Sequence, residues 1–106
     1  MKKVFIISNL GSLGDKDIVR ANLYCRMAWE QGFFPISSTA NIYNFIPYET
    51  TEQRKRALKL AAELMSECEE VWIFGEALNG ISIAQYRMAH QQRKIIREFD
   101  RYGTPM

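Results

Sequence analysis

The sequence predicts an α/β fold in which a parallel sheet of four strands is covered by helices on both faces. Unbroken apolar runs such as Lys3–Ser8 and Glu70–Gly75 are typical of strands that are buried on both sides. Segments with apolar residues at helical spacing separate these runs. The strand and helix patterns alternate in the order βαβαβαβ, which favours a parallel sheet with right-handed crossovers.

The first strand and the first helix are expected before residue 33. The strand Lys3–Ser8 leads into a loop that contains two glycines, Gly11–Gly14. Asp15 or Asp17 can cap the following helix, because a carboxylate accepts hydrogen bonds from the free amide groups of the first turn. Gly32 tolerates a left-handed backbone conformation and is expected to end this helix.

The second strand is expected at Phe33–Ile36 and at an edge of the sheet, because Pro35 cannot donate to a neighbouring strand. The segment after it, SSTANIYNFIPYET (37–50), reads as an irregular loop with room for one short helical turn. Loops of this length in compact domains are commonly functional. Its aromatic side chains either stack over a planar base or cover the sheet edge and fill the core. They are Tyr43, Phe45 and Tyr48.

The second half of the chain repeats the alternation of helix and strand. The predicted elements are a helix from its cap Thr51 to Cys68, a strand at Glu70–Gly75, a helix at about Ser82–Gln92 and a strand at Lys94–Phe99. In the last helix we expect Ile83, Tyr86 and either Ala89 or His90 to face the core. A single domain therefore spans residues 1–100, and residues 101–106 are expected to form a frayed tail.

The alternating pattern also predicts where a ligand binds. We expect a flavodoxin-like strand order, with the first and third strands at the centre of a three-layer, Rossmann-like sheet. In such folds the ligand lies outside the carboxyl ends of the strands, at the point where the strand order reverses. This rule brings Ser8, Asn9 and Leu10 to face Gly75 and Glu76.

Composition and charge argue against several classes of protein. The 106 residues are enough for one domain with a small core. A net charge of +2 gives no argument for nucleic acid or for an anionic membrane, and no apolar run is long enough for a signal peptide or a membrane span. Two cysteines, Cys25 and Cys68, and one histidine, His90, predict reduced thiols and no metal site. We therefore expect a cytoplasmic protein without a cofactor.

The loop after the first strand matches neither common phosphate-binding signature. Gly11 and Gly14 give GxxG rather than GxGxxG, and no P-loop lysine follows. The loop is either a flexible connection or a place where backbone amides and a helix N-terminus face a ligand. In the second case Ser8, Asn9 and Leu10 are binding residues.

The segment GEALNG (75–80) carries further candidate groups. Glu76 follows a central strand, where its carboxylate can reach a sugar hydroxyl or act as nucleophile or base; alternatively it is a solvated loop residue. Gly75 and Asn79 are candidate binding residues, although Asn79 and Gly80 can equally form the turn that starts the next helix.

Several longer segments match a known family. They are KVFIIS, ANLYCRMAWEQGFFPIS, TEQRKRALKLAAELMSECEEVWIFG and KIIREFD, and the most distinctive phrases are YCRMAWEQG-x-x-PI and C-x-E-x-W-I-F-G. From about Lys3 to Asp100 the chain resembles small nucleoside 2-deoxyribosyltransferase-like domains of bacteria and their phages. The resemblance implies a nucleoside or nucleotide-like ligand. It also implies a homo-oligomer, for which Trp29, Phe33 and Tyr43 are candidate exposed contacts.

The resemblance further implies a catalytic glutamate on the helix after the third strand, which attacks the anomeric carbon of a deoxyribosyl group. When the family pattern is anchored on Ala89 and the closing strand, Gln85 occupies this position, and a shift of one residue places Ala84 there. Neither side chain can form a glycosyl ester, so Glu76 is the nearest remaining carboxylate. From the residues alone, Gln85 is an ordinary helical glutamine.

Two binding segments also depart from the family pattern. Relatives commonly have Ser-Pro-aromatic where this chain has Ser8-Asn9-Leu10, and Pro-His where it has Ser37 and Ser38. These residues keep their expected place beside the ligand.

Three functions are open on the sequence. The first is an enzyme of the deoxyribosyltransferase or N-glycosidase type that works through Glu76. The second is a non-catalytic module that senses or sequesters a nucleotide-like ligand. The third is a protein-interaction factor, for example one encoded by a phage and acting on a host protein.

Overall fold

The computed structural model describes residues 1–10, 15–75, 78 and 80–106. Its elements, in chain order, are β1 (Lys2–Ser8), α1 (Asp15–Glu30), β2 (Phe33–Ser37), the short π-helix η1 (Thr39–Tyr43), α2 (Thr51–Ser66), β3 (Glu70–Phe74), α3 (Gly80–Gln91) and β4 (Ile95–Phe99). The predicted alternation of strands and helices is confirmed, with element ends shifted by one or two residues.

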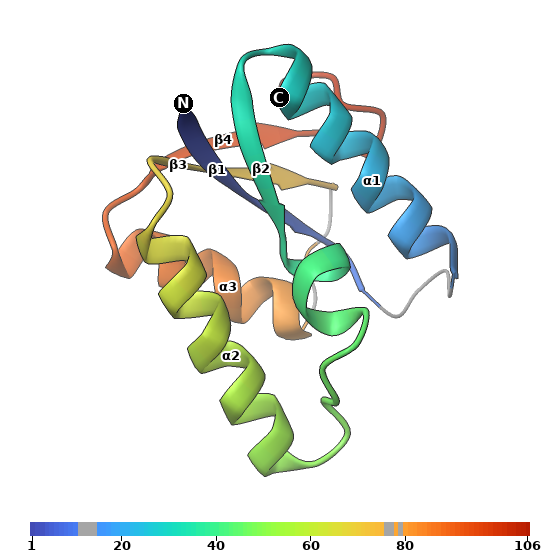
Figure 1. The fold of residues 1–106 in the computed structure, drawn as a ribbon, viewed down its shortest axis with the longest axis vertical. Helices are drawn as coiled ribbons and strands as arrows, with labels where there is room; N and C mark the ends of the chain where they lie inside the picture. Colours follow the sequence, from blue (N-terminus) through green and yellow to red (C-terminus); the bar gives the residue numbers. More distant parts are fainter. Residues whose placement is uncertain (11–14, 76–77, 79) are drawn as a thin grey trace.

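The four strands form one parallel sheet in the order β2-β1-β3-β4. This order confirms the predicted flavodoxin-like arrangement with β1 and β3 at the centre. It also confirms that β2, which carries Pro35, lies at an edge. Figure 1 shows α1 on one face of the sheet and α2 with α3 on the other, which gives the three layers of a Rossmann-like fold.

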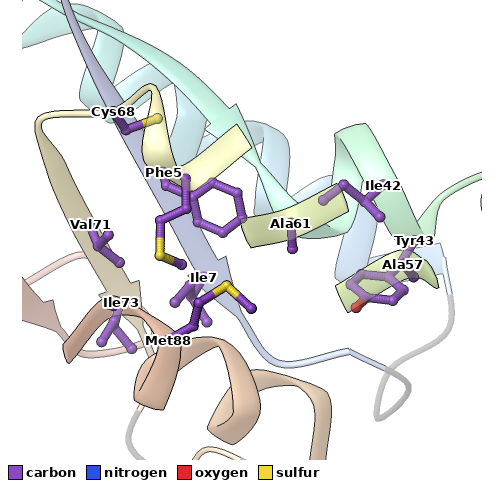
Figure 2. Close-up of a cluster of buried hydrophobic side chains, with 12 residues drawn as sticks. Phe5, Ile7, Ile42, Tyr43, Ala57, Ala61, Cys68, Val71, Ile73 and Met88 are labelled. Atoms are coloured by element: carbon purple, nitrogen blue, oxygen red, sulfur yellow. The ribbon is translucent and has the colours of Figure 1, made fainter. Parts of the chain in front are cut away.

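Both faces of the central strands are buried, as their unbroken apolar runs predict. Alternate residues of β1 serve the two layers: Val4 and Ile6 pack with the α1 side chains, whereas Phe5 and Ile7 pack toward α2 and α3. Figure 2 shows the second layer, in which Phe5 and Ile7 lie among side chains from β3, α2 and α3. Tyr43 lies at the end of this layer, beside Ala57.

The segment 37–50 is more regular than an open loop, since η1 gives it one short helix. Tyr43 and Ile42 of η1 are buried in the core layer, so the prediction of Tyr43 as an exposed contact is wrong. The core-filling alternative holds for Tyr43, which packs edge-on against Tyr48 with ring centroids 5.2 Å apart. Phe45 remains exposed.

The first turn of α2 is capped one residue earlier than predicted. The side chain of Thr50, not Thr51, accepts a hydrogen bond from the backbone N–H of Gln53 at 3.1 Å. The Gln53 side chain in return accepts from the backbone N–H of Thr50, also at 3.1 Å, which completes a capping box. Both threonines suit a cap, and the reciprocal bond with the glutamine three residues later selects Thr50.

The inward face of α3 also differs from the prediction. The buried residues are Ser82, Gln85, Met88 and Ala89, whereas Ile83 and Tyr86 are only partly buried and His90 is exposed. The prediction took the apolar residues as the inward stripe. The prediction is confirmed for Ala89, and Tyr86 packs against the core while only partly buried. Two polar residues, Ser82 and Gln85, share the buried face, because the first turn of the helix packs at the end of β1.

The C-terminal segment is folded rather than frayed. Pro105 pairs with Phe99 in an antiparallel bridge. The Asp100 carboxylate accepts hydrogen bonds from the backbone N–H groups of Tyr102 and Thr104, both at 2.9 Å. The Tyr24 hydroxyl of α1 donates to the carbonyl of Arg101 at 2.7 Å. These contacts hold the segment against α1 and β4.

Across the described residues, no helix has the length and apolarity that a membrane crossing needs.

Candidate ligand-binding site

The ends of β1 and β3 meet as predicted. Ser8, the last residue of β1, is the register partner of Phe74 at the end of β3. One residue further on, a Cβ placed on Gly75 would lie 3.7 Å from Nδ2 of Asn9. Gly75 has φ of +119°, a backbone conformation that L side chains rarely adopt. Glycine therefore suits the backbone conformation directly after β3.

A cluster of buried polar side chains lies beyond the end of β1. We call it the polar ring; it consists of Ser8, Thr39, Tyr43, Ser82 and Gln85, each less than a tenth exposed. The Oγ of Ser8 and the Oγ1 of Thr39 are 3.2 Å apart and share a hydrogen bond. The Ser82 hydroxyl donates to the backbone carbonyl of Ser8 at 3.1 Å. These two bonds tie η1 and α3 to the carboxyl end of β1.

Helix geometry places the remaining two members of the ring. Gln85 follows Ser82 by three positions and Tyr43 follows Thr39 by four, so each shares a helix face with the earlier residue. Gln85 lies close enough to the Tyr43 hydroxyl to lower the pKa of that hydroxyl, although burial has the larger effect and the pKa is raised overall. The pair does not reach hydrogen-bond geometry.

Gln85 is the unusual member of the ring. Its side chain is fully buried, and within the described part of the chain neither Nε2 nor Oε1 has a hydrogen-bond partner. A buried polar group without a partner costs about 1–3 kcal/mol of stability. An apolar side chain of similar size avoids this cost, so the glutamine indicates a role other than packing.

The turn between β2 and η1 positions Thr39. The backbone N–H of Ser37 donates to Oδ1 of Asn41 at 2.7 Å, and the hydroxyl of Ser37 accepts from the N–H of Ala40 at 3.1 Å. Ser38 is buried at the N-cap of η1 but its side chain makes no capping bond. The hydroxyl of Ser37 therefore holds the chain turn, and Thr39 is the residue of this segment that reaches Ser8.

The polar ring is electrically neutral, since it contains three hydroxyl residues of the serine and threonine type, one phenol and one amide. The buried carboxylate of Glu70 lies at the opposite end of the strands, at the start of β3, where it pairs with Arg97 at 2.9 Å and accepts from Nε1 of Trp72. Within the described part of the chain, no three metal-binding side chains come together. The ring can thus supply hydrogen-bond donors and acceptors, but none of its groups is a strong nucleophile.

A family profile described as a domain of unknown function (DUF7768) matches residues 2–99. The chain belongs to the DUF7768 family. A comparison with curated proteins gave no match. The family description names no activity, so the resemblance to nucleoside 2-deoxyribosyltransferases stays a prediction.

The structure of this DUF7768 domain gathers only some of the predicted site residues. Ser8 and Gln85 belong to the polar ring, and Asn9 and Gly75 lie beside it at the strand ends. Leu10 is partly buried and packs against the core layer of α2 and α3. Ser37 and Ser38 lie in the turn that precedes η1. The candidate nucleophile Glu76 and the candidate binding residue Asn79 lie outside the described residues.

Two residues of the ring, Thr39 and Ser82, were not predicted as site residues, whereas Tyr43 was a candidate for stacking over a base. Thr39 and Tyr43 lie in a segment whose short helix has no sequence signal, because five residues are too few for a periodic pattern. Ser82 was taken as the start of the last helix. The sequence does contain a pattern that could have identified Ser82 and Gln85. They are uncharged polar residues three positions apart, on the same helix face as Met88 and Ala89.

Proposed function

We propose that this DUF7768 domain binds a nucleoside or nucleotide-like small molecule beyond the carboxyl ends of β1 and β3. The observation that carries the proposal is the fully buried Gln85 amide, which has no partner among the described residues and lies in a neutral polar ring. The position supports it as well, because open parallel sheets bind ligands where the strand order reverses, which here is between β1 and β3. The resemblance to nucleoside 2-deoxyribosyltransferases suggests the class of ligand.

Cleavage of the ligand's N-glycosidic bond is a separate question from its binding. The resemblance calls for a carboxylate nucleophile on α3, and the amide of Gln85 cannot take that role. Any N-glycosidic cleavage would therefore depend on Glu76, the carboxylate that follows β3 in the sequence. Binding without cleavage is the function that the polar ring supports best.

Two assays test the proposal. Thermal shift and titration calorimetry with ribo- and deoxyribonucleosides and their monophosphates should show saturable binding of at least one of them. Incubation with deoxynucleosides, followed by separation of free base, tests for cleavage. Base release that is abolished by Glu76→Ala would assign a hydrolase or transferase. Binding without base release would assign a sensing or sequestering module. No binding by any of these compounds would overturn the proposal.

A protein-interaction role is the second candidate. It is supported by three large apolar side chains of α1 that are each more than half exposed: Val19, Leu23 and Trp29. A self-contact through this surface would give the homo-oligomer that the resemblance implies. Light scattering on the wild type and on Trp29→Glu tests this. A dimer that dissociates in the variant supports it, and a monomeric wild type contradicts it.

A further inference from the structure

The amide of Gln85 carries both hydrogen-bond donors and acceptors that are not used within the described chain. Nε2 carries two donor hydrogens, and Oε1 has two acceptor lone pairs. Both atoms are buried, and no side chain or backbone group of residues 1–10, 15–75, 78 and 80–106 pairs with either of them. Gln92, the residue after α3, differs in one of its two polar atoms: its Oε1 is also buried without a partner among the described residues, but its Nε2 donates to the carbonyl of Ala62 in α2 at 3.1 Å. The amide of Gln92 therefore makes one structural hydrogen bond, whereas the amide of Gln85 makes none to the described residues.

A group that satisfies Gln85 must present a donor and an acceptor side by side. A phosphate or a carboxylate offers acceptors only, and an ammonium group offers donors only, so either would leave one atom of the amide unpaired. The edges of nucleobases offer both kinds of group, and glutamine pairs with such edges through two parallel hydrogen bonds. The amide can rotate by half a turn, so it can match bases that present either order of donor and acceptor.

We infer that the carboxamide of Gln85 is the anchor for the base of the ligand, held by a pair of hydrogen bonds to a donor–acceptor edge of an uncharged nucleobase. This inference rests on the proposed function. The neighbours of Gln85 agree with it, since Tyr43 and Ser82 are neutral and flank the amide from η1 and from the preceding turn of α3. Because the amide is enclosed, a neighbouring side chain must move aside for the base to reach it.

The experiment compares two isosteric variants, Gln85→Met and its matched control Gln92→Met. Thermal unfolding without ligand is measured first. Gln85→Met should be at least as stable as the wild type, because it removes an unpaired amide. Gln92→Met should be less stable, because it breaks the bond to Ala62. Binding of uridine and adenosine is then measured by calorimetry. We expect Gln92→Met to bind as the wild type does, and Gln85→Met to bind at least about tenfold more weakly.

A second arm uses the wild type alone, so that it does not depend on the folding of a variant. N3-methyluridine lacks the ring N–H of uridine, and N6,N6-dimethyladenosine lacks the amino hydrogens of adenosine. Each should bind about tenfold more weakly than its parent, because one of the two hydrogen bonds is lost. Methyl riboside tests whether the sugar, whose neighbouring hydroxyls also offer donors and acceptors, pairs with the amide instead.

The outcomes separate this inference from the proposed function. If Gln85→Met binds nucleosides as tightly as the wild type, or if the methylated bases bind as well as their parents, nucleoside binding stands and the role of Gln85 is wrong. Methyl riboside binding that is lost in Gln85→Met would assign the amide to the sugar and overturn the inference. If no nucleoside binds the wild type or Gln92→Met, both the proposed function and the inference are wrong.

Discussion

At the scale of single residues, burial decides what each side chain can do. Residue type alone assigns no special role to a glutamine, a cysteine or a glycine. In the fold, Gln85 has an unpaired buried amide, Cys68 is 2% exposed and Gly75 has a positive φ. Each of these states has a measurable energetic consequence.

Gly75→Ala is expected to destabilise the protein through the backbone. Of the residues that the structure describes, a Cβ at this position meets only Asn9, at an ordinary contact distance of 3.7 Å, so crowding contributes little. The φ of +119° is unfavourable for alanine, and residues held in such regions cost about 1–3 kcal/mol. Chemical denaturation should show a loss in this range. Asn9→Ala serves as the control, since it removes the neighbouring side chain and leaves the backbone unstrained. A neutral effect of Gly75→Ala would contradict the prediction.

Cys68 is expected to make the protein sensitive to alkaline pH. Burial raises the pKa of this thiol from 9.0 to about 11, despite the opposing effect of Lys94. The folded state therefore keeps its proton at a pH where the unfolded state loses it. The thiol therefore contributes fully to the free energy of unfolding below pH 9, and this contribution is lost as the pH rises toward about 11.

Replacement by valine removes this titration. The unfolding free energy of the wild type and of Cys68→Val should be compared by denaturant titration from below pH 9 up to about 11. Tyr24 and Tyr43 also have raised pKa values, so both proteins should lose stability. The wild type should lose more unfolding free energy over this pH range than Cys68→Val does. Loss of the Sγ hydrogen bond to Leu64 shifts the variant equally at all pH values. Parallel curves would rule out a contribution from Cys68.

At the scale of secondary-structure elements, the sequence predicted the strands more accurately than it predicted the ends of the helices. A strand buried on both faces needs an unbroken apolar run, and Val4–Ile7 and Val71–Phe74 satisfy this without ambiguity. Helix ends depend on individual hydrogen bonds, which adjacent residues of similar type can make equally well. Thr50 and Thr51 are such a pair.

Exchange of these two threonines for alanine tests the cap of α2. Thr50→Ala removes the acceptor for the N–H of Gln53 and should cost about 1 kcal/mol. Thr51→Ala should change the unfolding free energy by less than about 0.5 kcal/mol, because its hydroxyl lies outside the capping box. Denaturant titration of the two variants measures this. Equal losses would show that the cap is shared between the two residues.

At the scale of the whole molecule, contacts between distant segments complete the fold. The rings of Tyr24 and Phe74 stack with centroids 4.1 Å apart, and Phe74 and Phe99 stack at 4.7 Å. The C-terminal segment closes over this column through the bond from Tyr24 to Arg101 and the bridge at Pro105. The chain end thereby becomes part of the layer that contains α1.

Removal of residues 101–106 should therefore destabilise the domain. The truncation loses the hydrogen bonds that join this segment to Tyr24, Glu98 and Asp100, each worth about 0.5–1.5 kcal/mol, so we expect a loss of about 2 kcal/mol or more. Tyr24→Phe in the full chain keeps the ring stack and loses one bond, and should cost about 1 kcal/mol. Thermal unfolding of both variants measures this. An unchanged midpoint in the truncated protein would indicate a dispensable tail.

The sequence by itself determined the α/β class, the parallel sheet, the central position of β1 and β3 and the edge position of β2. These features depend on local patterns: apolar runs, helical spacing and a proline that cannot donate. Only the tertiary structure decided the membership of the polar ring, because Ser8, Thr39, Tyr43, Ser82 and Gln85 come from three separate elements. No local pattern records that their side chains meet or that the amide of Gln85 is left without a partner. Those facts arise when the crossovers bring η1 and α3 to the same end of β1.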